Sequence, residues 1–190
     1  ARIESFGSPF TDATMLFTDG AAHDRLRRSV RDVFSRTSID RLGTGIESIC
    51  ADAISTIPAD EPVDLMSQVL IPLPIAIIGT WLGLDSDQCV ALREHSPAIA
   101  RMLGGPVDQL ELDDGLGAAA ALLTNFLPAA ADRRARPRGD LLSYLATDRT
   151  LTLDEVVATA ILIAVAGHET TANLLGASLI RLLTSTDDGN

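Results

Sequence analysis

The sequence predicts an all-α, mainly helical fold in which shorter helices pack around one long buried helix. Residues that can cap a helix recur before segments whose apolar side chains repeat at helical spacing. No pair of segments shows the alternation of apolar and polar residues that is typical of neighbouring strands. Apolar residues then dominate from Leu153 to Thr184, about 32 residues or roughly 48 Å of helix, which is enough to cross a domain.

Each earlier helix is expected to begin at a Ser, Asp or Val after an irregular or turn-rich segment. Ser and Asp favour helix starts because their side chains accept hydrogen bonds from the free N–H groups of the first turn. The expected helices run from Asp19 to about Phe34, from Ser38 or Asp40 to about Ile57, from Val63 to Leu84 with a bend at Pro72 and Pro74, from Ser86 to about Met102, from Asp108 to Arg134, and from Asp140 to Ala146.

The long last helix has clear start signals. Thr152 and Glu155 have the spacing of a capping box, and Leu151 can pack on Val156 as a hydrophobic staple. Residues 156–166 are apolar nearly all round, so this part should be buried on every side.

A membrane span is the alternative interpretation of this helix. The unbroken apolar run is too short for a span, and His168 and Glu169 interrupt it. We therefore expect a core helix of a globular protein.

Composition limits the function classes. The formal net charge of −11 argues against general nucleic-acid binding and against docking on anionic membranes. Cys50 and Cys89 form neither a disulfide framework nor a metal motif. No signal peptide or lipidation motif is visible, which favours a cytoplasmic protein.

The 190 residues suit one domain or part of a larger one. The chain begins at Ala1 without an initiator methionine and ends in a polar stretch just after a long core helix. A helix that is apolar all round needs neighbours on every side. We therefore expect residues 1–190 to be a single partial domain of a longer protein.

The most informative motif is Ala166-Gly167-His168-Glu169-Thr170-Thr171, within the most apolar helix. Glycine and threonine lower helix propensity, and an unpaired buried carboxylate is costly. Local rules broken together inside a core element indicate a functional site.

A second candidate site lies in the first helix. His23 and Arg27 are four residues apart and share one helix face, and Arg31 extends that stripe. Two adjacent cationic donors can clamp a carboxylate. The alternative is a solvated basic face that pairs with acids elsewhere on the chain.

These two motifs resemble those of a known family. Residues 14–28 are similar to the region leading into and through the C helix of bacterial cytochrome P450 enzymes, the haem-thiolate monooxygenases. Residues 166–171 are similar to their I-helix signature, A-G-x-[DE]-T-T, and the resemblance extends in order along nearly the whole chain. It implies the central portion of the cytochrome P450 fold, from before the C helix through the I helix.

The resemblance implies a role for each site residue. His23 and Arg27 would hold the haem propionates, and Glu169 and Thr170 would be the catalytic acid–alcohol pair that delivers protons to dioxygen. Residues at or beside the haem would be Ala166, Gly167, Thr171, Leu16, Met15 and Phe34, while Met15, Ile163 and the Ser5–Phe17 loop would border the substrate pocket.

The implied activity is hydroxylation or epoxidation of a small organic substrate with dioxygen. The cofactor would be haem b with its iron, and the electrons would come from a ferredoxin and a ferredoxin reductase. The cysteine thiolate that ligates the iron in this family is not in this chain, because neither Cys50 nor Cys89 has the Phe and Gly surroundings of the thiolate loop. The N-terminal strands and the E-x-x-R pair of the family are also absent, so the isolated chain is expected to be inactive.

Three alternatives remain open. The chain could be a non-catalytic helical scaffold, similar to family members that support a partner biosynthetic enzyme. His168-Glu169 resembles the start of an H-E-x-x-H zinc motif, but Ala172 occupies the place of the second histidine. The basic run 132–138 is either solvated surface or a docking site for an acidic redox partner.

Overall fold

The computed structural model describes residues 8–105 and 107–185, and within these ranges all regular elements are helical. This confirms the predicted fold class. The elements are α1 (Pro9–Ala13), α2 (Gly20–Arg31), the 3₁₀ turn η1 (Asp32–Phe34), α3 (Arg36–Asp40), α4 (Gly43–Ser55), the π-helical segment η2 (Met66–Leu70), α5 (Pro72–Leu82), α6 (Ser86–Gly104), α7 (Gln109–Ala135), α8 (Leu141–Thr147) and α9 (Leu153–Ser185).

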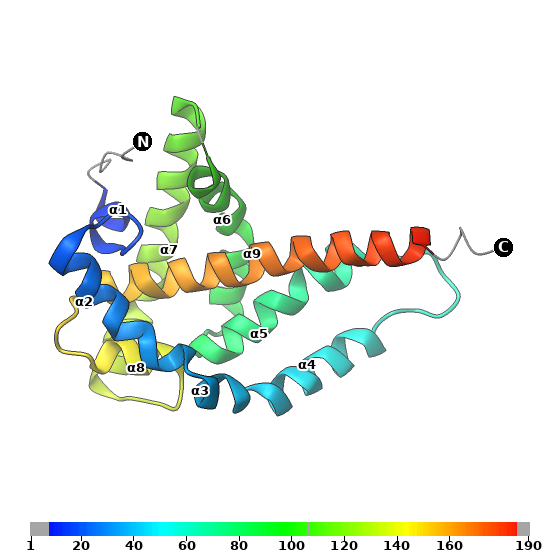
Figure 1. The fold of residues 1–190 in the computed structure, drawn as a ribbon, viewed down its shortest axis with the longest axis horizontal. Helices are drawn as coiled ribbons and strands as arrows, with labels where there is room; N and C mark the ends of the chain where they lie inside the picture. Colours follow the sequence, from blue (N-terminus) through cyan, green and yellow to red (C-terminus); the bar gives the residue numbers. More distant parts are fainter. Residues whose placement is uncertain (1–7, 106, 186–190) are drawn as a thin grey trace.

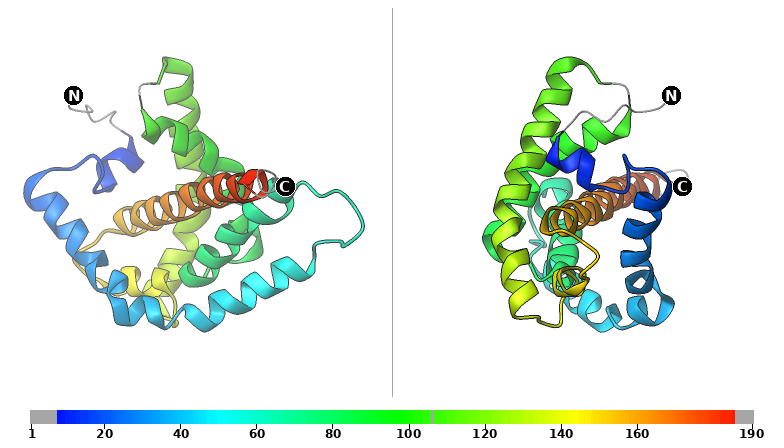
Figure 2. Two further views of the ribbon diagram at one scale, coloured as in Figure 1. Left: turned by 45° about the vertical axis from the view of Figure 1, so that its right-hand side comes forward. Right: turned by 90° about the vertical axis from the view of Figure 1, so that its left-hand side faces the viewer.

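The long helix α9 runs through the middle of the molecule and organises the other helices (Figure 1). It contacts α1, α5, α6, α7, α8 and η2. Seen from the end of the molecule, α7 lies on one side of α9 and α2 on the other (Figure 2). The fold therefore holds two layers of helices around one central element.

The core lies where α9 meets α7 and α8. Its largest fully buried side chains include Phe126 and Leu122 of α7, Leu142 and Leu145 of α8, and Ile161 of α9. Each such side chain stabilises the fold by about 1.5–3 kcal/mol relative to an exposed position. The predicted capping box of α9 is present, because Thr152 N–H donates to Glu155 Oε2 at 2.9 Å and Glu155 N–H donates to Thr152 Oγ1 at 3.1 Å.

Several predicted helix starts differ from the structure. Asp19 occupies the N-cap position of α2, but its side chain accepts no capping hydrogen bond. Asp85 caps α6 instead of Ser86, because the Asp85 carboxylate and the Gln88 side chain form a reciprocal capping box. The second predicted helix is two helices, with a break between Asp40 and Gly43.

The predicted bend between Val63 and Leu84 is a change of helix type. The π-helical segment η2 precedes α5, which begins at Pro72, where a missing N–H is harmless. The helix ends at Gly83, whose φ of 75° is left-handed and favours glycine.

By length and composition, α9 is the one described helix that could cross a membrane. However, 56% of its most apolar window is buried inside the protein. A core helix meets the same criterion, and the contacts of α9 with six other elements fit that interpretation.

Candidate functional site

Arg25 of helix α2 forms hydrogen bonds with residues at the start of α9 and in the loop before it. Its guanidinium donates to the Thr150 carbonyl at 2.9 Å and to Glu155 Oε2 at 3.0 Å, with a second, shorter contact to Glu155 Oε1. The hydrogen bond from Arg25 holds the pKa of the Glu155 carboxyl below its usual value. Leu26 and Val30 are buried. The register of α2 is thereby fixed against α9.

The predicted clamp residues flank Arg25 on α2. The His23 side chain is 34% exposed, and its Nδ1 lies 3.5 Å from Asp24 Oδ1. Arg27 is exposed, and within residues 8–105 and 107–185 no group pairs with its guanidinium. Its donors are therefore available to a carboxylate from outside the described chain.

The clamp and the I-helix-like motif do not touch each other. Arg25 fixes α2 at Glu155, and Ala166 lies about 17 Å further along α9 at 1.5 Å per residue. A ligand that contacted both sites would have to span the distance between them.

The motif residues of α9 form an open, small-residue face. Ala166, Gly167, Thr170 and Thr171 are all exposed, and Ile163 is half-buried one turn before Gly167. Because α-helical residues three and four apart lie on one side, these positions make one continuous strip.

Both threonine hydroxyls are bonded within the helix. Thr170 Oγ1 donates to the Ala166 carbonyl at 2.7 Å, and Thr171 Oγ1 donates to the Gly167 carbonyl at 2.7 Å. The Thr170 oxygen is therefore an acceptor in this conformation. The resemblance assigned Thr170 to catalysis, and this geometry adds that its own proton is already engaged.

On the other side of the strip, Glu169 is partly exposed and belongs to a hydrogen-bonded cluster whose other two side chains are buried. His168 is 2% exposed, and its Nε2 lies 2.8 Å from Ser96 Oγ on α6. Ser96 Oγ also lies 3.1 Å from Glu169 Oε1, and His168 Nδ1 lies 2.7 Å from the Ala164 carbonyl oxygen. We call the side chains of Ser96, His168 and Glu169 the Ser96 cluster.

Sequence reasoning did not single out Ser96, and it considered His168 only as part of an incomplete zinc motif. Ser96 lies 72 positions before His168, in a segment that carries no recognisable motif. Only the unusual presence of Pro97 inside α6 distinguishes this stretch of sequence.

Gly167 serves the packing of α9 as well as its open face. A Cβ atom at this position would lie 3.3 Å from Cδ1 of Ile78 on α5. The glycine therefore allows a close crossing of the two helices at the motif.

The remaining predicted pocket residues lie on the α1–α2 connection and on η1. Leu16 is 49% exposed and Met15 is half-buried. Phe34 is 51% exposed and packs edge-on against Trp81 of α5, with ring centroids 5.5 Å apart. Within the Ser5–Phe17 loop, residues 5–7 lie outside the described residues, and Phe10 is buried in the core.

The alternative sites receive little support. In the part of the chain that the structure describes, no three His, Cys, Asp or Glu side chains gather as metal ligands.

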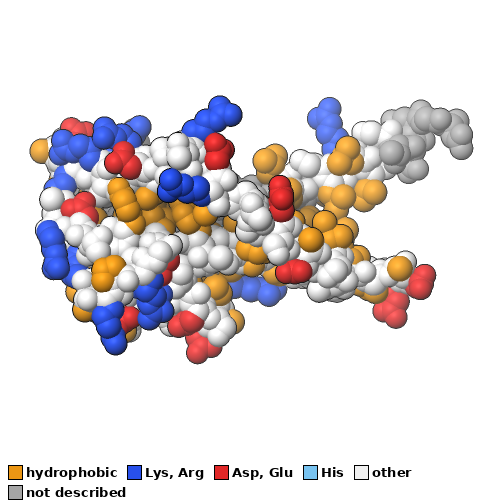
Figure 3. Space-filling model, turned by 90° about the horizontal axis from the view of Figure 1, so that it is seen from below, with side chains coloured by type: hydrophobic (Ala, Val, Ile, Leu, Met, Phe, Trp, Pro, Cys, Tyr) orange, Lys and Arg blue, Asp and Glu red, His pale blue; other side chains and the backbone are white. Residues whose placement is uncertain are grey.

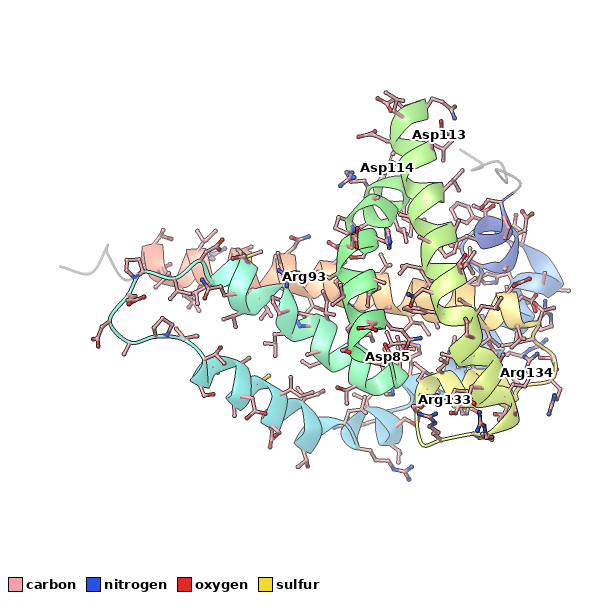
Figure 4. The ribbon with its side chains drawn as sticks, turned by 180° about the vertical axis from the view of Figure 1, so that it is seen from behind. Asp85, Arg93, Asp113, Asp114, Arg133 and Arg134 are labelled. Atoms are coloured by element: carbon pink, nitrogen blue, oxygen red, sulfur yellow. The ribbon has the colours of Figure 1, made fainter. Side chains whose placement is uncertain are left out.

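The prediction of a solvated basic run is wrong for Arg133, which is 6% exposed and donates to Asp140 Oδ2 at 2.8 Å and to the Gly83 carbonyl at 2.9 Å. Arg133 and Arg134 lie at the end of α7, beside α8 (Figure 4). Arg134 donates to the Ala146 and Leu151 carbonyls, each at 2.8 Å.

Comparison with curated proteins identifies consistent relatives. The chain is 31% identical over 185 residues to cytochrome P450 107B1 of Saccharopolyspora erythraea, which covers 95% of this chain and 44% of that protein. It is 34% identical over 180 residues to the vitamin D(3) 25-hydroxylase of Pseudonocardia autotrophica, covering 91% of this chain and 42% of that protein. The chain thus spans less than half the length of these relatives. No protein-family model matches.

Solved structures give the same result for the fold. The mycinamicin VIII C21 methyl hydroxylase of Micromonospora griseorubida matches with a TM-score of 0.80 at 28% identity, over 92% of this chain and 44% of that one. A P450 crystallised with an acyl carrier protein matches with a TM-score of 0.87 over 99% of this chain and 50% of that one, at 23% identity, which supports the fold alone.

Proposed function

Because the chain belongs to the cytochrome P450 family over the segment that it spans, we propose that it is the central, partial domain of a haem-dependent monooxygenase. The complete protein would activate dioxygen to hydroxylate or epoxidise a small organic substrate. The observation that carries the proposal is the open strip of small residues on α9, with the Glu169–Thr170 pair at its edge.

The groups on α2 and α9 fit a haem by their chemistry. The Arg27 guanidinium offers five N–H donors with no partner in the described chain, and His23 lies one turn away, so together they suit two propionates. The strip of Ala166, Gly167 and Thr170 leaves room for a flat apolar group. Leu16 and Phe34 supply exposed apolar surface of the kind that a macrocycle covers.

The thiolate ligand would come from outside this chain. Cys50 lies in α4 and Cys89 in α6, and burial raises the pKa of the Cys89 thiol, which disfavours the thiolate. A Cβ at Gly79 would lie 2.6 Å from Cys89 Sγ, so Cys89 fills the contact between α5 and α6. The isolated chain is therefore proposed to be inactive.

When bound, haem supplies the redox centre that activates dioxygen. The residues of this chain would orient the reactants and handle protons around it. Glu169 is 26% exposed and can exchange protons with water on one side while it contacts Ser96 on the other. Thr170 can accept a hydrogen bond on the open strip, since its own proton is held by Ala166. Ile163 and Met15 would border the substrate.

Electrons would reach the complete protein from a ferredoxin and its reductase, as is common for bacterial members of this family. A reduced carbon-monoxide difference spectrum of the full-length protein tests the haem-thiolate centre. A full-length protein whose spectrum shows no haem with a thiolate ligand would favour the non-catalytic scaffold instead.

Replacing Arg27 tests the proposed propionate clamp. Arg27→Ala in the complete protein should weaken haem binding by about 10- to 100-fold, the worth of one charge-assisted hydrogen bond to a carboxylate. The measurement is the rate of haem transfer to an excess of apomyoglobin. Arg28→Ala is the matched control, because it removes the same charge from an adjacent exposed position on another face of α2. Equal haem retention in the two variants would contradict the clamp.

Replacing Thr170 tests the proposed acid–alcohol pair. Thr170→Ala should leave haem bound but divert reduced oxygen into hydrogen peroxide, because the strip loses its hydroxyl. The measurement is product formed and peroxide released for each NADH consumed. Thr184→Ala is the control, since Thr184 makes the same bond to the carbonyl four residues earlier, that of Ile180, near the end of α9. Unchanged coupling in Thr170→Ala would remove the assigned role.

A further inference from the structure

The Ser96 cluster contains one more acceptor than its protons can serve if its acid is ionised and its histidine is neutral. The Ala164 carbonyl only accepts, so His168 Nδ1 at 2.7 Å must donate to it. Ser96 has one hydroxyl proton, yet its oxygen lies 2.8 Å from His168 Nε2 and 3.1 Å from Glu169 Oε1. With Nδ1 protonated and both Nε2 and Oε1 bare, one of these two contacts has no proton.

The other neutral tautomer does not remove the conflict. If the proton lies on Nε2, His168 can donate to Ser96 and Ser96 to Glu169. The bare Nδ1 then faces the Ala164 oxygen at 2.7 Å, and two acceptors oppose each other inside the protein. A buried contact of this kind is costly.

One additional proton satisfies all three contacts, in two arrangements. In the first, Glu169 is protonated and donates to Ser96, Ser96 donates to Nε2, and Nδ1 donates to Ala164. In the second, His168 is an imidazolium that donates from Nε2 to Ser96 and from Nδ1 to Ala164, and Ser96 donates to an ionised Glu169. Moving two protons through the Ser96 hydroxyl converts one arrangement into the other without change of total charge.

Among the described residues, His168 is placed to supply the positive charge beside an ionised Glu169 carboxylate. Nε2 of His168 lies 3.5 Å from Glu169 Oε1, and among the described residues no arginine pairs with that carboxylate. Arg93, which lies on α6 three residues before Ser96 (Figure 4), donates to the Ser67 carbonyl at 3.4 Å.

We propose that Ser96 and His168 form a one-proton store behind Glu169, in which Ser96 relays the proton between the imidazole and the carboxyl group. The store lies on the buried side of α9, and Glu169 connects it to the strip that carries Thr170. Ser96 and His168 are positioning residues, because they act through Glu169. The inference rests on the proposed monooxygenase function for its use, but the shared proton is a property of the cluster itself.

The shared proton can be read directly by NMR. The complete protein, in its diamagnetic ferrous carbon-monoxide form at pH 7, would carry ¹⁵N-histidine and ¹³C-glutamate, with assignments made by His168→Gln and Glu169→Gln. The expected result is either an imidazolium at His168 with an ionised Glu169, or a neutral His168 protonated on Nδ1 with a protonated Glu169. A neutral His168 beside an ionised Glu169, in either tautomer, would overturn the proposal.

The relay has a functional test with a matched control. Ser96→Ala should lower the product formed per NADH by about tenfold, the worth of one charge-assisted hydrogen bond, and Ser96→Thr should restore it. Thr159→Val is the control, because the Thr159 hydroxyl is buried on the same helix with no partner in the described chain. Full coupling in Ser96→Ala, or equal loss in Ser96→Ala and Ser96→Thr while both bind haem, would count against the relay.

The outcomes distinguish the inference from the function on which it rests. If Thr170→Ala uncouples the enzyme and Ser96→Ala does not, the relay is wrong and the monooxygenase proposal stands. If the NMR result is as expected and neither variant changes coupling, the roles assigned to Thr170 and Ser96 in catalysis fail while the shared proton stands. If the full-length protein gives no haem-thiolate spectrum with carbon monoxide, the proposed function fails, and the NMR experiment still tests the shared proton.

Discussion

The two halves of α9 are both rich in apolar residues, but their surroundings differ. In the first half, Val156–Ile161 are all buried, and Ala164 and Val165 are buried too. In the second half, from Ala166 onward, only His168, Ala172 and Gly176 are buried. Leu174, Ile180, Leu182 and Leu183 are between 61% and 67% exposed.

The difference shows which contacts this chain supplies for itself. The first half of α9 lies in the hydrophobic core together with residues of α1, α5, α6, α7 and α8. Hydrophobic side chains lie uncovered along the arm of the molecule that carries the end of α9 (Figure 3). Large exposed apolar surfaces mark contacts with another molecule or segment. The second half therefore fits the proposed partial domain, in which haem and further segments of the same protein cover this face.

The largest expected effect separates the two halves by mutation. Ile161→Ala, at a fully buried position, should lower the free energy of unfolding by about 2–5 kcal/mol. Ile180 is 65% exposed here, and Ile180→Ala at such a surface position would cost less than about 0.5 kcal/mol. If other segments cover this face, Ile180→Ala in the complete protein should cost about 2 kcal/mol or more. Urea unfolding of the complete protein measures both variants.

This comparison has two informative outcomes. A large cost at position 180 in the complete protein would show that the second half is covered there. A negligible cost at position 180 beside a large cost at 161 would mean that the exposed face of α9 stays exposed, and would contradict the partial-domain proposal.

An intermediate effect on the free energy of unfolding is expected at Glu155, at the start of the first half of α9. Glu155→Gln should cost about 1–2 kcal/mol, because it weakens the charge-assisted hydrogen bonds from Arg25 that fasten α2 to α9. Asp154→Asn is the matched control, since this exposed acid lies in the same helical turn and pairs with no arginine of the described residues. It should cost less than about 0.5 kcal/mol. Urea unfolding at pH 7 tests the pair, and equal costs would contradict the anchoring role.

The pH dependence of this anchor has a defined sign. The pKa of Glu155 is lowered in the folded protein, chiefly by the hydrogen bond from Arg25, so the unfolded state binds the proton more readily. The stabilisation is therefore fully present above the ordinary glutamate pKa and is lost as pH falls through the lower, folded value. Glu155→Gln should flatten this part of the acid denaturation curve.

The fold was predictable mainly where a single helix carries its own signals. The Thr152–Glu155 capping box and the apolar run of α9 are local, and both are present. The capping residue of α6 was misplaced by one position, because Ser86 and Asp85 are both good caps and only Asp85 forms the reciprocal pair with Gln88. The π-helical segment η2 had no signal apart from the prolines that follow it.

The candidate site was predictable only along each helix. The motif of residues 166–171 and the His23–Arg27 pair could be found by spacing, because each lies on one helix. Ser96 could not, since its role depends on how α6 crosses α9. Nor could Gly167 be understood from propensity alone, because Ile78 of α5 occupies the space beside it.

The smallest expected effect is at Gly167, where two opposing terms nearly cancel. In the first half of α9, Ala160→Gly should lower the free energy of unfolding by at least about 1 kcal/mol, because it lowers helix propensity and removes a buried methyl group. In the second half of α9, Gly167→Ala should stabilise the helix by a similar amount through its higher helix propensity. The new Cβ, however, would be crowded, because it would lie 3.3 Å from Ile78 Cδ1. We expect a net change in unfolding free energy within about 0.5 kcal/mol.

Removing the crowding atom separates the two terms at Gly167. Ile78→Val deletes Cδ1, and the next contact of the new Cβ is then Cγ1 at an ordinary 3.7 Å. In that background Gly167→Ala should stabilise the protein by about 0.5–1 kcal/mol, because only the propensity term is left. A double-mutant cycle in urea measures this difference. An identical effect of Gly167→Ala in both backgrounds would mean that Ile78 of α5 does not restrict the side chain at position 167 of α9.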